Sequence, residues 1–442
     1  MDPRYGIAGQ NVTTGSGDDR EASSDAARGR QLTVGLLAGG DSFEDFYDKI
    51  GVSIEDFRTR LSGGWLLSYV DALRSADVRT VLVFVSSRVD GPRRFVHGAT
   101  GAPVWILPEP PLHRALVKAR DRWWRSSALA SLASYASTPL RALFRVLDRE
   151  RCDAILCQEY ESTRFDLSVL TRRFHGRPVY ATYQGANETA GLLEGLIRRR
   201  TVRRCDGLII ASGSERTRVS TTYRMALERI APIPNAVDVV GWRPIDRDAA
   251  RGRLGIADDA GVVEWHGHAQ VWRKGLDVLL DAWGLVCAER PDRDLLLLLV
   301  GQGRNTGELR RRVEGDRRVR WIDRYVHDRD ELKTYVCAAD VYTLPSRHEG
   351  FAIAPLEAMA CGLPVVAADA SGIADLLGDG EEAGGVVVPR EDPVALATAL
   401  GRLLEDPALA HQLGSKARRR ADEEFSLAVV GLRLRDFVFP TV

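Results

Sequence analysis

The stretch that decides the fold is 339–377, which reads ADVYTLPSRHEGFAIAPLEAMACGLPVVAADASGIADLL. Its apolar run Val341–Leu344 is followed by Pro and Gly, which predicts a short buried strand that ends in a loop. Pro355 suits the first turn of a helix, where its missing N–H costs nothing. Glu349 is therefore expected in a loop at the carboxyl end of a strand. Glu357 is expected about two turns further on, inside the helix.

Between these two carboxylates lies a helix N-terminus, whose free N–H groups and dipole suit a diphosphate. The Glu-x7-Glu spacing, the EGF start and the EAMACGLPVVA continuation resemble the donor-binding signature of the retaining family 4 glycosyltransferases, which have the GT-B fold. The resemblance implies that Glu349 contacts the donor sugar and that Glu357 contacts the ribose hydroxyls. It also implies a backbone cradle for sugar and phosphate at Gly350, Phe351, Ala352 and Ile353.

Short apolar runs alternate with helical stretches along most of the chain, in one set between 33 and 211 and another between 262 and 388. Continuous apolar runs with helices between them predict parallel strands covered on both faces. We therefore expect an α/β protein with two Rossmann-like, doubly wound domains facing a central cleft, which is the GT-B architecture that the resemblance implies. The connector IAPIPNAVDVVGWRP at 230–244 resembles the linker of that family.

These patterns divide the chain into parts. The expected parts are a disordered tail over 1–30, an acceptor domain over 31–235, a nucleotide-sugar donor domain over 236–425, and a last helix within 426–442 that returns to the first domain.

The segment HGHAQVWRKGLDVLLDAW at 266–283 resembles the phosphate clamp of the family. Lys274, followed by Gly, matches the usual Lys-Gly pair, whereas His268 stands where an arginine is usual. We expect Lys274 to neutralise the departing diphosphate, helped by Arg273 or by His268. Fixed cations of this kind stabilise charge that develops on a leaving group.

Glycine pairs mark two further turns. Gly301 and Gly303 follow an apolar strand and resemble the glycine turn that lies beside the nucleotide in the family. Gly63 and Gly64 open a predicted helix, and we expect their backbone to approach the donor phosphate and the acceptor. The glycines at 39–40 are an alternative for that role.

The loop TYQGANET at 182–189 follows a predicted strand at a point where the family often has a histidine near the sugar. Gln184 stands there instead, and its amide can donate or accept a hydrogen bond but cannot carry a proton. Three carboxylates of nearby loops could meet an acceptor, although a surface position is the simpler interpretation; they are Glu159, Glu161 and Glu188.

The composition limits the kinds of molecule that the protein is expected to bind. The formal net charge is zero, which gives no indication of nucleic-acid binding. Three Asp-Arg-Asp triplets are explained by capping and solvation, and the GT-B resemblance requires no metal, so we expect neither a metal nor another cofactor. The six cysteines form no CxxC, and the chain has no apolar h-region and no span of about 18 apolar residues, which indicates a cytoplasmic protein.

The segment 112–145 is basic, and over 112–151 nine Arg or Lys oppose three acidic residues. A basic amphipathic helix here would make peripheral contact with an anionic membrane on its inner face; a helix packed on the first sheet is the alternative.

The function that the resemblance implies is transfer of a hexosyl group, with retention, from a nucleotide sugar to a hydroxyl of a polysaccharide, glycolipid or lipid-linked glycan. A non-catalytic nucleotide-sugar binding protein and a nucleotide-sugar epimerase stay open. A dinucleotide oxidoreductase is disfavoured because no GxGxxG follows a first strand.

Overall fold

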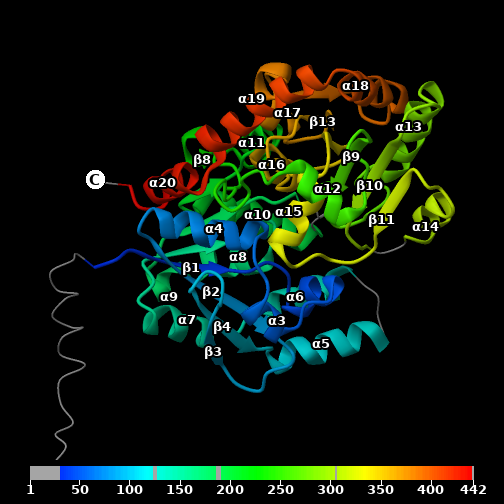
Figure 1. The fold of residues 1–442 in the computed structure, drawn as a ribbon. Coiled ribbons are helices and arrows are strands. Elements are labelled where there is room, and N and C mark those ends of the chain that lie inside the picture. Colours follow the sequence, from blue (N-terminus) through cyan, green and yellow to red (C-terminus); the bar gives the residue numbers. More distant parts are fainter. Residues whose placement is uncertain (1–29, 123–126, 186–190, 304–305, 441–442) are drawn as a thin grey trace, which may run out of the picture.

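The computed structural model describes residues 30–122, 127–185, 191–303 and 306–440. They form two α/β bodies, one built from the blue to green half of the chain and the other from the green to orange half (Figure 1). Each body contains one sheet, and the two sheets share no strand. The α/β fold class predicted from the sequence is confirmed.

The first sheet has eight strands in the order β3-β4-β2-β1-β5-β6-β7-β8, and every neighbouring pair is parallel except β3–β4. Its strands are β1 Thr33–Leu37, β2 Arg79–Ser86, β3 Arg93–Val96, β4 Pro103–Pro108, β5 Ala154–Cys157, β6 Val179–Thr182, β7 Gly207–Ile209 and β8 Ile230–Ala231. The helices of this body are α2 Glu44–Tyr47, α3 Ile54–Thr59, α4 Gly64–Ser75, α5 Pro111–Arg122, α6 Ser127–Ala136, α7 Leu140–Arg149, α8 Thr163–Leu170, α9 Arg172–His175, α10 Leu192–Arg204 and α11 Gly213–Tyr223, with 3-10 turns η1 Asp48–Ile50 and η2 Leu227–Arg229.

The second sheet has six parallel strands in the order β11-β10-β9-β12-β13-β14. Its strands are β9 Gly261–His266, β10 Leu295–Val300, β11 Val319–Ile322, β12 Val341–Leu344, β13 Val365–Ala368 and β14 Gly385–Val388. The remaining helices are α12 Arg247–Leu254, α13 Leu276–Glu289, α14 Gly307–Val313, α15 Arg329–Cys337, α16 Ala354–Ala360, α17 Ile373–Leu377, α18 Pro393–Glu405, α19 Pro407–Phe425 and α20 Leu427–Val438, with the 3-10 turn η3 Gly380–Ala383.

Each sheet separates two apolar cores, which explains its continuous apolar strands. In the first body α3, α4 and α20 cover one face, and α7, α8, α10 and α11 cover the other. In the second body α15, α16 and α19 cover one face, and α13 and α18 cover the other. Alternate residues of β10 point into the two cores, so the LLLLLV run buries every side chain.

The last helix, α20, belongs in space to the first body. It lies against α4, where Figure 1 shows the red helix beside the blue one. An added Cβ at Gly431 would lie 1.9 Å from the carbonyl oxygen of Ala72, so the two helix backbones touch. Ser75 Oγ also donates to the carbonyl of Leu427 at 2.9 Å.

Three local expectations were wrong or incomplete. Ile230–Ala231 pairs with β7 as strand β8, so the connector begins later than its prolines and asparagine indicated. The edge strand β3 was missed because its side chains, RRFV, are largely exposed and carry no apolar run. The single basic helix expected from Leu112 onward is two helices, α5 and α6, that pack against each other; its tryptophans 123–124 lie outside the described residues. The tail over 1–30 also lies outside them, except for Arg30.

Candidate active site

The Glu-x7-Glu segment has the local structure expected from its sequence. Strand β12 ends at Leu344, a loop follows, and α16 begins at Ala354 with Pro355 in its first turn. Both carboxylates are buried, with Glu349 6% exposed and Glu357 8% exposed. A buried carboxylate needs a partner, and each of the two has a cation.

Lys274 is the partner of Glu349. Its Nζ lies 2.7 Å from Glu349 Oε1, and the lysine side chain keeps 20% of its surface exposed. The turn that presents the lysine is tight, because Gly275 has φ of +63° and an added Cβ would lie 2.0 Å from the carbonyl oxygen of Pro345. Arg347 stabilises this turn, because its Nη1 donates to Asp277 Oδ1 at 2.8 Å and to the carbonyl oxygen of Trp272 at 2.6 Å.

His266 is the partner of Glu357, and the sequence analysis missed it. Its Nε2 lies 3.0 Å from Glu357 Oε2, while its Nδ1 lies 3.0 and 3.1 Å from the two oxygens of Glu264. Burial by itself would lower the pKa of His266, but the two carboxylates outweigh it and raise the pKa to about 10. Burial also raises the pKa of Glu264. The only signal in the sequence was two polar residues within the otherwise apolar strand β9.

Arg273 does not point to an open anion site. Its Nη2 donates to the carbonyl of Gly185 at 3.0 Å, so it links the second body to the loop after β6 of the first. The loops touch directly here, because an added Cβ at Gly350 would lie 2.6 Å from the carbonyl carbon of Gln184. His268 lies half-buried in the loop after β9. The structure thus gives the predicted clamp two different tasks: the Lys274–Glu349 pair and an interdomain contact.

Gln184 lies at the same contact between the bodies. Asn235 Nδ2 donates to Gln184 Oε1 at 3.1 Å and to the carbonyl of Phe351 at 2.7 Å. The backbone N–H of Gln184 donates to Glu159 Oε2 at 3.0 Å. Glu159 therefore supports the loop from within the first body, and Asn235 of the connector joins that loop to the Glu-x7-Glu loop. Asn235 is a second residue that the sequence analysis assigned no role.

The glycines divide into two kinds. Gly301 and Gly303 lie against the backbone of another loop, because added Cβ atoms would lie 1.9 Å from the carbonyl oxygens of Gly267 and Ala269, respectively. Close packing of the loops after β9 and β10 is a sufficient reason for both. Gly63 and Gly64 have φ of +79° and +77° at the start of α4, and among the described residues only their own chain neighbours and helix backbone could lie within 4 Å of an added Cβ. Space around this backbone is compatible with the approach to a ligand that was predicted for the pair.

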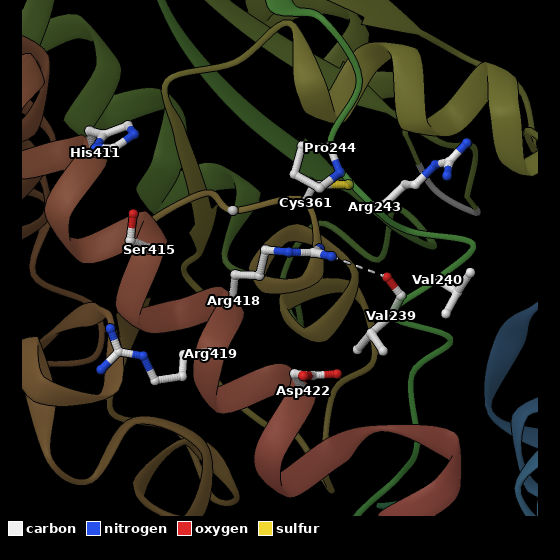
Figure 2. A pocket seen from close by; sticks show the side chains of 11 residues that line it. Val239, Val240, Arg243, Pro244, Cys361, His411, Ser415, Arg418, Arg419 and Asp422 are labelled. Carbon is white, nitrogen blue, oxygen red and sulfur yellow. Dashed lines mark hydrogen bonds between the residues drawn. The ribbon is translucent and has the colours of Figure 1, made fainter.

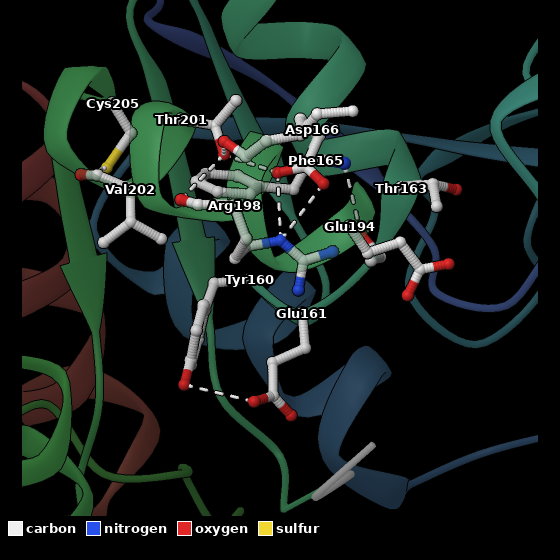
Figure 3. A network of polar contacts seen from close by, with 12 residues as sticks. Tyr160, Glu161, Thr163, Phe165, Asp166, Glu194, Arg198, Thr201, Val202 and Cys205 are labelled. Atoms are coloured by element: carbon white, nitrogen blue, oxygen red, sulfur yellow. Dashed lines mark hydrogen bonds and ion pairs between the residues drawn. The ribbon is translucent and has the colours of Figure 1, made fainter. Parts of the chain in front are cut away.

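The first body contains a buried polar network (Figure 3). Arg198 Nε lies 2.9 and 3.1 Å from the two oxygens of Asp166, and Tyr135 and Thr201 donate to the same carboxylate at 2.7 and 2.5 Å. Arg218 pairs with Glu161 at 3.0 Å. These contacts give Glu161 a structural role, and Glu188 lies outside the described residues.

A surface depression of about 740 Å³ lies away from these residues, between α19 and the connector. Figure 2 shows Arg418 of α19 reaching toward the carbonyl of Val239, at 3.5 Å. Arg418 also donates to the carbonyl of Ala360 at the end of α16. The depression is therefore the outer side of a packed junction and contains none of the predicted site residues.

Two expectations concern metals and membranes. Asp246 and Asp328 cap α12 and α15 by accepting N–H groups of their first turns, whereas the third triplet, 292–294, lies exposed in the loop before β10. In the described part of the chain, no group of three or more His, Cys, Asp or Glu is placed to hold a metal ion. Among the same residues, no helix combines the length and apolar character that crossing a membrane requires.

The fold and the contacts between strand-end loops define the class: two α/β bodies with mainly parallel sheets that meet at the carboxyl ends of their strands, as in GT-B proteins. Solved structures share this fold. Sucrose-phosphate synthase from Thermosynechococcus elongatus has a TM-score of 0.67 at 21% identity and covers 91% of this chain and 97% of its own. Anabaena HepE in complex with UDP has a TM-score of 0.65 at 18% identity, covering 92% and 99%. These identities establish likeness of fold alone.

The sequence gives the family. The model for Glycosyltransferase Family 4 matches residues 66–240, and that for Glycosyl transferases group 1 matches residues 261–406. The chain therefore belongs to the family 4, group 1 glycosyltransferases, as its Glu-x7-Glu segment predicted.

Curated relatives are similar over part of their length. A D-inositol 3-phosphate glycosyltransferase of Jonesia denitrificans is 34% identical over 227 residues, which is 49% of this chain and 53% of that protein. A GDP-mannose-dependent monoacylated alpha-(1-6)-phosphatidylinositol monomannoside mannosyltransferase of Corynebacterium glutamicum is 34% identical over 47% of this chain and 55% of its own. The chain thus matches about half the length of these relatives.

Proposed function

We propose that this protein transfers a hexosyl group from a nucleoside-diphosphate sugar to an acceptor hydroxyl, with retention at the anomeric carbon. The observation that carries the proposal is the half-buried Lys274–Glu349 pair, 2.7 Å long, at the loop where the two bodies meet. An ammonium group has three hydrogens, so Lys274 can hold Glu349 and still donate to a diphosphate. Glu349 can in turn accept from a sugar hydroxyl.

In this reaction the acceptor oxygen forms a bond to the anomeric carbon while the bond from that carbon to the leaving phosphate oxygen breaks. The acceptor proton passes to the departing phosphate, so no side chain has to act as a base. Lys274 offsets the charge that grows on the diphosphate. Arg273 bound to Gly185 O would hold the two bodies together and exclude water from the reacting atoms.

The donor is proposed to carry UDP or GDP. A structural neighbour was solved with UDP, and a sequence relative is described as GDP-mannose-dependent. The acceptor is proposed to be a glycan or a lipid-linked hydroxyl, and D-inositol 3-phosphate is a small soluble probe for it because several relatives are named for it. We further propose that no metal or other cofactor is needed, since Lys274 supplies a cation at the diphosphate.

A basic surface for membrane contact is proposed on the α5–α6 pair. Leu112 and Leu132 are 62% and 50% exposed, and Arg114 and Lys118 of α5 are exposed as well. The buried His113 ties the pair together by contacting the carbonyl of Ala133 at 2.6 Å. Sedimentation with vesicles of anionic and of zwitterionic lipid tests this surface: binding to anionic vesicles alone, weakened by salt, is the expected result.

The main test is release of nucleotide from UDP-glucose, GDP-mannose and related donors, with and without D-inositol 3-phosphate and with excess EDTA. We expect release from one donor, unaffected by EDTA and abolished in Glu357→Ala. Binding without turnover under every acceptor condition would favour the non-catalytic binder, an interpretation that the contact of Arg273 with protein also allows. Formation of a new nucleotide sugar without any acceptor would favour the epimerase. Absence of binding to every donor would refute the proposal.

A further inference from the structure

A buried histidine between two buried carboxylates lies beside the site, and no step of the proposed reaction uses it. Glu264, His266 and Glu357 are 0%, 4% and 8% exposed, respectively. Glu264 and His266 come from strand β9, whereas Glu357 comes from α16, which follows the neighbouring strand β12. The imidazole therefore connects the middle of the sheet to the helix that carries the second carboxylate of the Glu-x7-Glu pair.

The distances specify how the imidazole is held. Both oxygens of Glu264 lie within 3.1 Å of Nδ1, and Glu357 Oε2 lies 3.0 Å from Nε2. An imidazole that faces a carboxylate through each nitrogen donates from both only when it is protonated. With the ring charged, the trio carries one net negative charge instead of two in a buried place.

The other groups around the ring do not compete for it. The ring of Tyr342, on β12, lies 5.2 Å from that of His266. Burial raises the pKa of Tyr342, and Glu264, Glu349 and Glu357 add to the rise. Burial and Glu357 likewise raise the pKa of Tyr325, to about 12. On α15, a hydrogen bond with Cys361 lowers the pKa of Cys337 to about 7, although Glu264 opposes this shift. Both phenols stay neutral at the pH at which the histidine titrates.

We propose that His266, held by Glu264, is a positioning residue that fixes the Glu357 carboxylate for the ribose of the donor nucleotide. The proposal rests on the proposed function. One oxygen of Glu357 is committed to His266, and, among the described side chains, His266 is the only one that donates to this carboxylate. Glu357 Oε1 is thereby left to accept from a ribose hydroxyl, in an orientation that the buried imidazole sets.

The test is a double-mutant cycle on nucleotide affinity, with UDP and GDP as the probes, measured by calorimetry on the full chain. His266→Gln keeps a hydrogen-bond donor but removes the charge, and we expect it to weaken nucleotide binding about tenfold at pH 7.5, as loss of a charge-assisted hydrogen bond does. Glu357→Gln should weaken binding at least as much. The double variant should equal Glu357→Gln within about twofold, because His266 acts only through that carboxylate.

A purely structural role is separated by two readouts. Val263→Ala, a buried neighbour on β9, should lower the melting temperature without changing nucleotide affinity. The ratio of the His266→Gln to the wild-type dissociation constant should fall toward one as the pH rises to about 10, where the wild-type imidazole loses its charge. If His266→Gln does not fold, Glu264→Gln takes its place in the same cycle with the same expectation.

Additive losses in the double variant, or unchanged affinity in His266→Gln, overturn the positioning role while the wild-type protein still binds nucleotide. Failure of the wild-type protein to bind UDP or GDP instead overturns the proposed function, and the positioning role with it.

Discussion

Replacing Lys274 by methionine removes the charge that faces Glu349 and keeps the packing of the lysine stem. At 2.7 Å the Coulomb attraction is about 6 kcal/mol at an effective dielectric constant of about 20. Solvent reaches a fifth of the lysine side chain, and part of that attraction is offset by desolvation. We therefore expect Lys274→Met to cost about 3 kcal/mol of unfolding free energy, the lower end for a broken buried ion pair.

The matched control is the double variant Lys274→Met/Glu349→Gln, which leaves a neutral amide in place of the stranded carboxylate. A buried amide costs less than an unpaired charge, so the double variant should recover about 2 kcal/mol relative to Lys274→Met. Activity should behave differently. Both variants lose the cation that is proposed to face the diphosphate, so nucleotide release should fall about 100-fold or more in each.

Urea unfolding followed by tryptophan fluorescence gives the stability of the four proteins in the cycle, and nucleotide release gives their activity. The reasoning requires recovery of stability without recovery of activity. If the loss of stability in the double variant equals the sum of the losses in the two single variants, Lys274 and Glu349 are not energetically coupled. Lys274→Met with wild-type turnover would refute the assignment of this lysine to the leaving group.

Three further predictions follow from the contacts described above. Gly350→Ala places a methyl group against backbone of the other body, so it should widen the molecule in small-angle scattering and abolish turnover; Gly284→Ala, with open space around it, should do neither. His266 has its pKa raised to about 10, so its contribution to stability is full below about pH 6.5, declines above it and is lost by about pH 10; the difference in urea midpoint between wild type and His266→Gln should shrink over that range. Asp166→Asn leaves the buried Arg198 without its counter-charge and should cost about 3 to 5 kcal/mol; an unchanged urea midpoint would contradict this.

Local patterns predicted much of the fold. Continuous apolar runs such as Leu295–Val300 become buried parallel strands because both faces of each sheet are covered. Pro355 marked the start of α16 because it fits only the first turn of a helix. Strand β3 was not predicted, because an antiparallel edge strand with exposed side chains needs neither continuous nor alternating apolar residues.

The contacts between side chains of the candidate site could not be predicted from local sequence patterns. His266 and Glu357 are 91 residues apart, and only the adjacency of β9 and β12 brings them together. The contact of Arg273 with Gly185 depends on how the two bodies meet, which no spacing within one body can specify. The Gly-x-Gly turn at Gly301 resembles a ligand-binding loop in its sequence. In the structure the loop after β9 packs against this turn, and that close contact by itself requires residues without a Cβ.

Each carboxylate of the Glu-x7-Glu segment pairs with a cation from the segment 266–274, which runs from the end of β9 toward α13. The order of the cations along the chain is the reverse of the order of the carboxylates. The earlier cation, His266 at the end of its strand, holds the later carboxylate, Glu357; the later cation, Lys274 in the loop, holds the earlier carboxylate, Glu349. This order makes an inner pair with a histidine 4% exposed and an outer pair with a lysine 20% exposed. Water reaches Lys274 of the outer pair, and in the proposed reaction this lysine donates to a diphosphate while it still holds Glu349. His266 of the inner pair has no such access, and it can hold Glu357, whose side chain is 11% exposed, in place while the outer pair binds and releases its ligand.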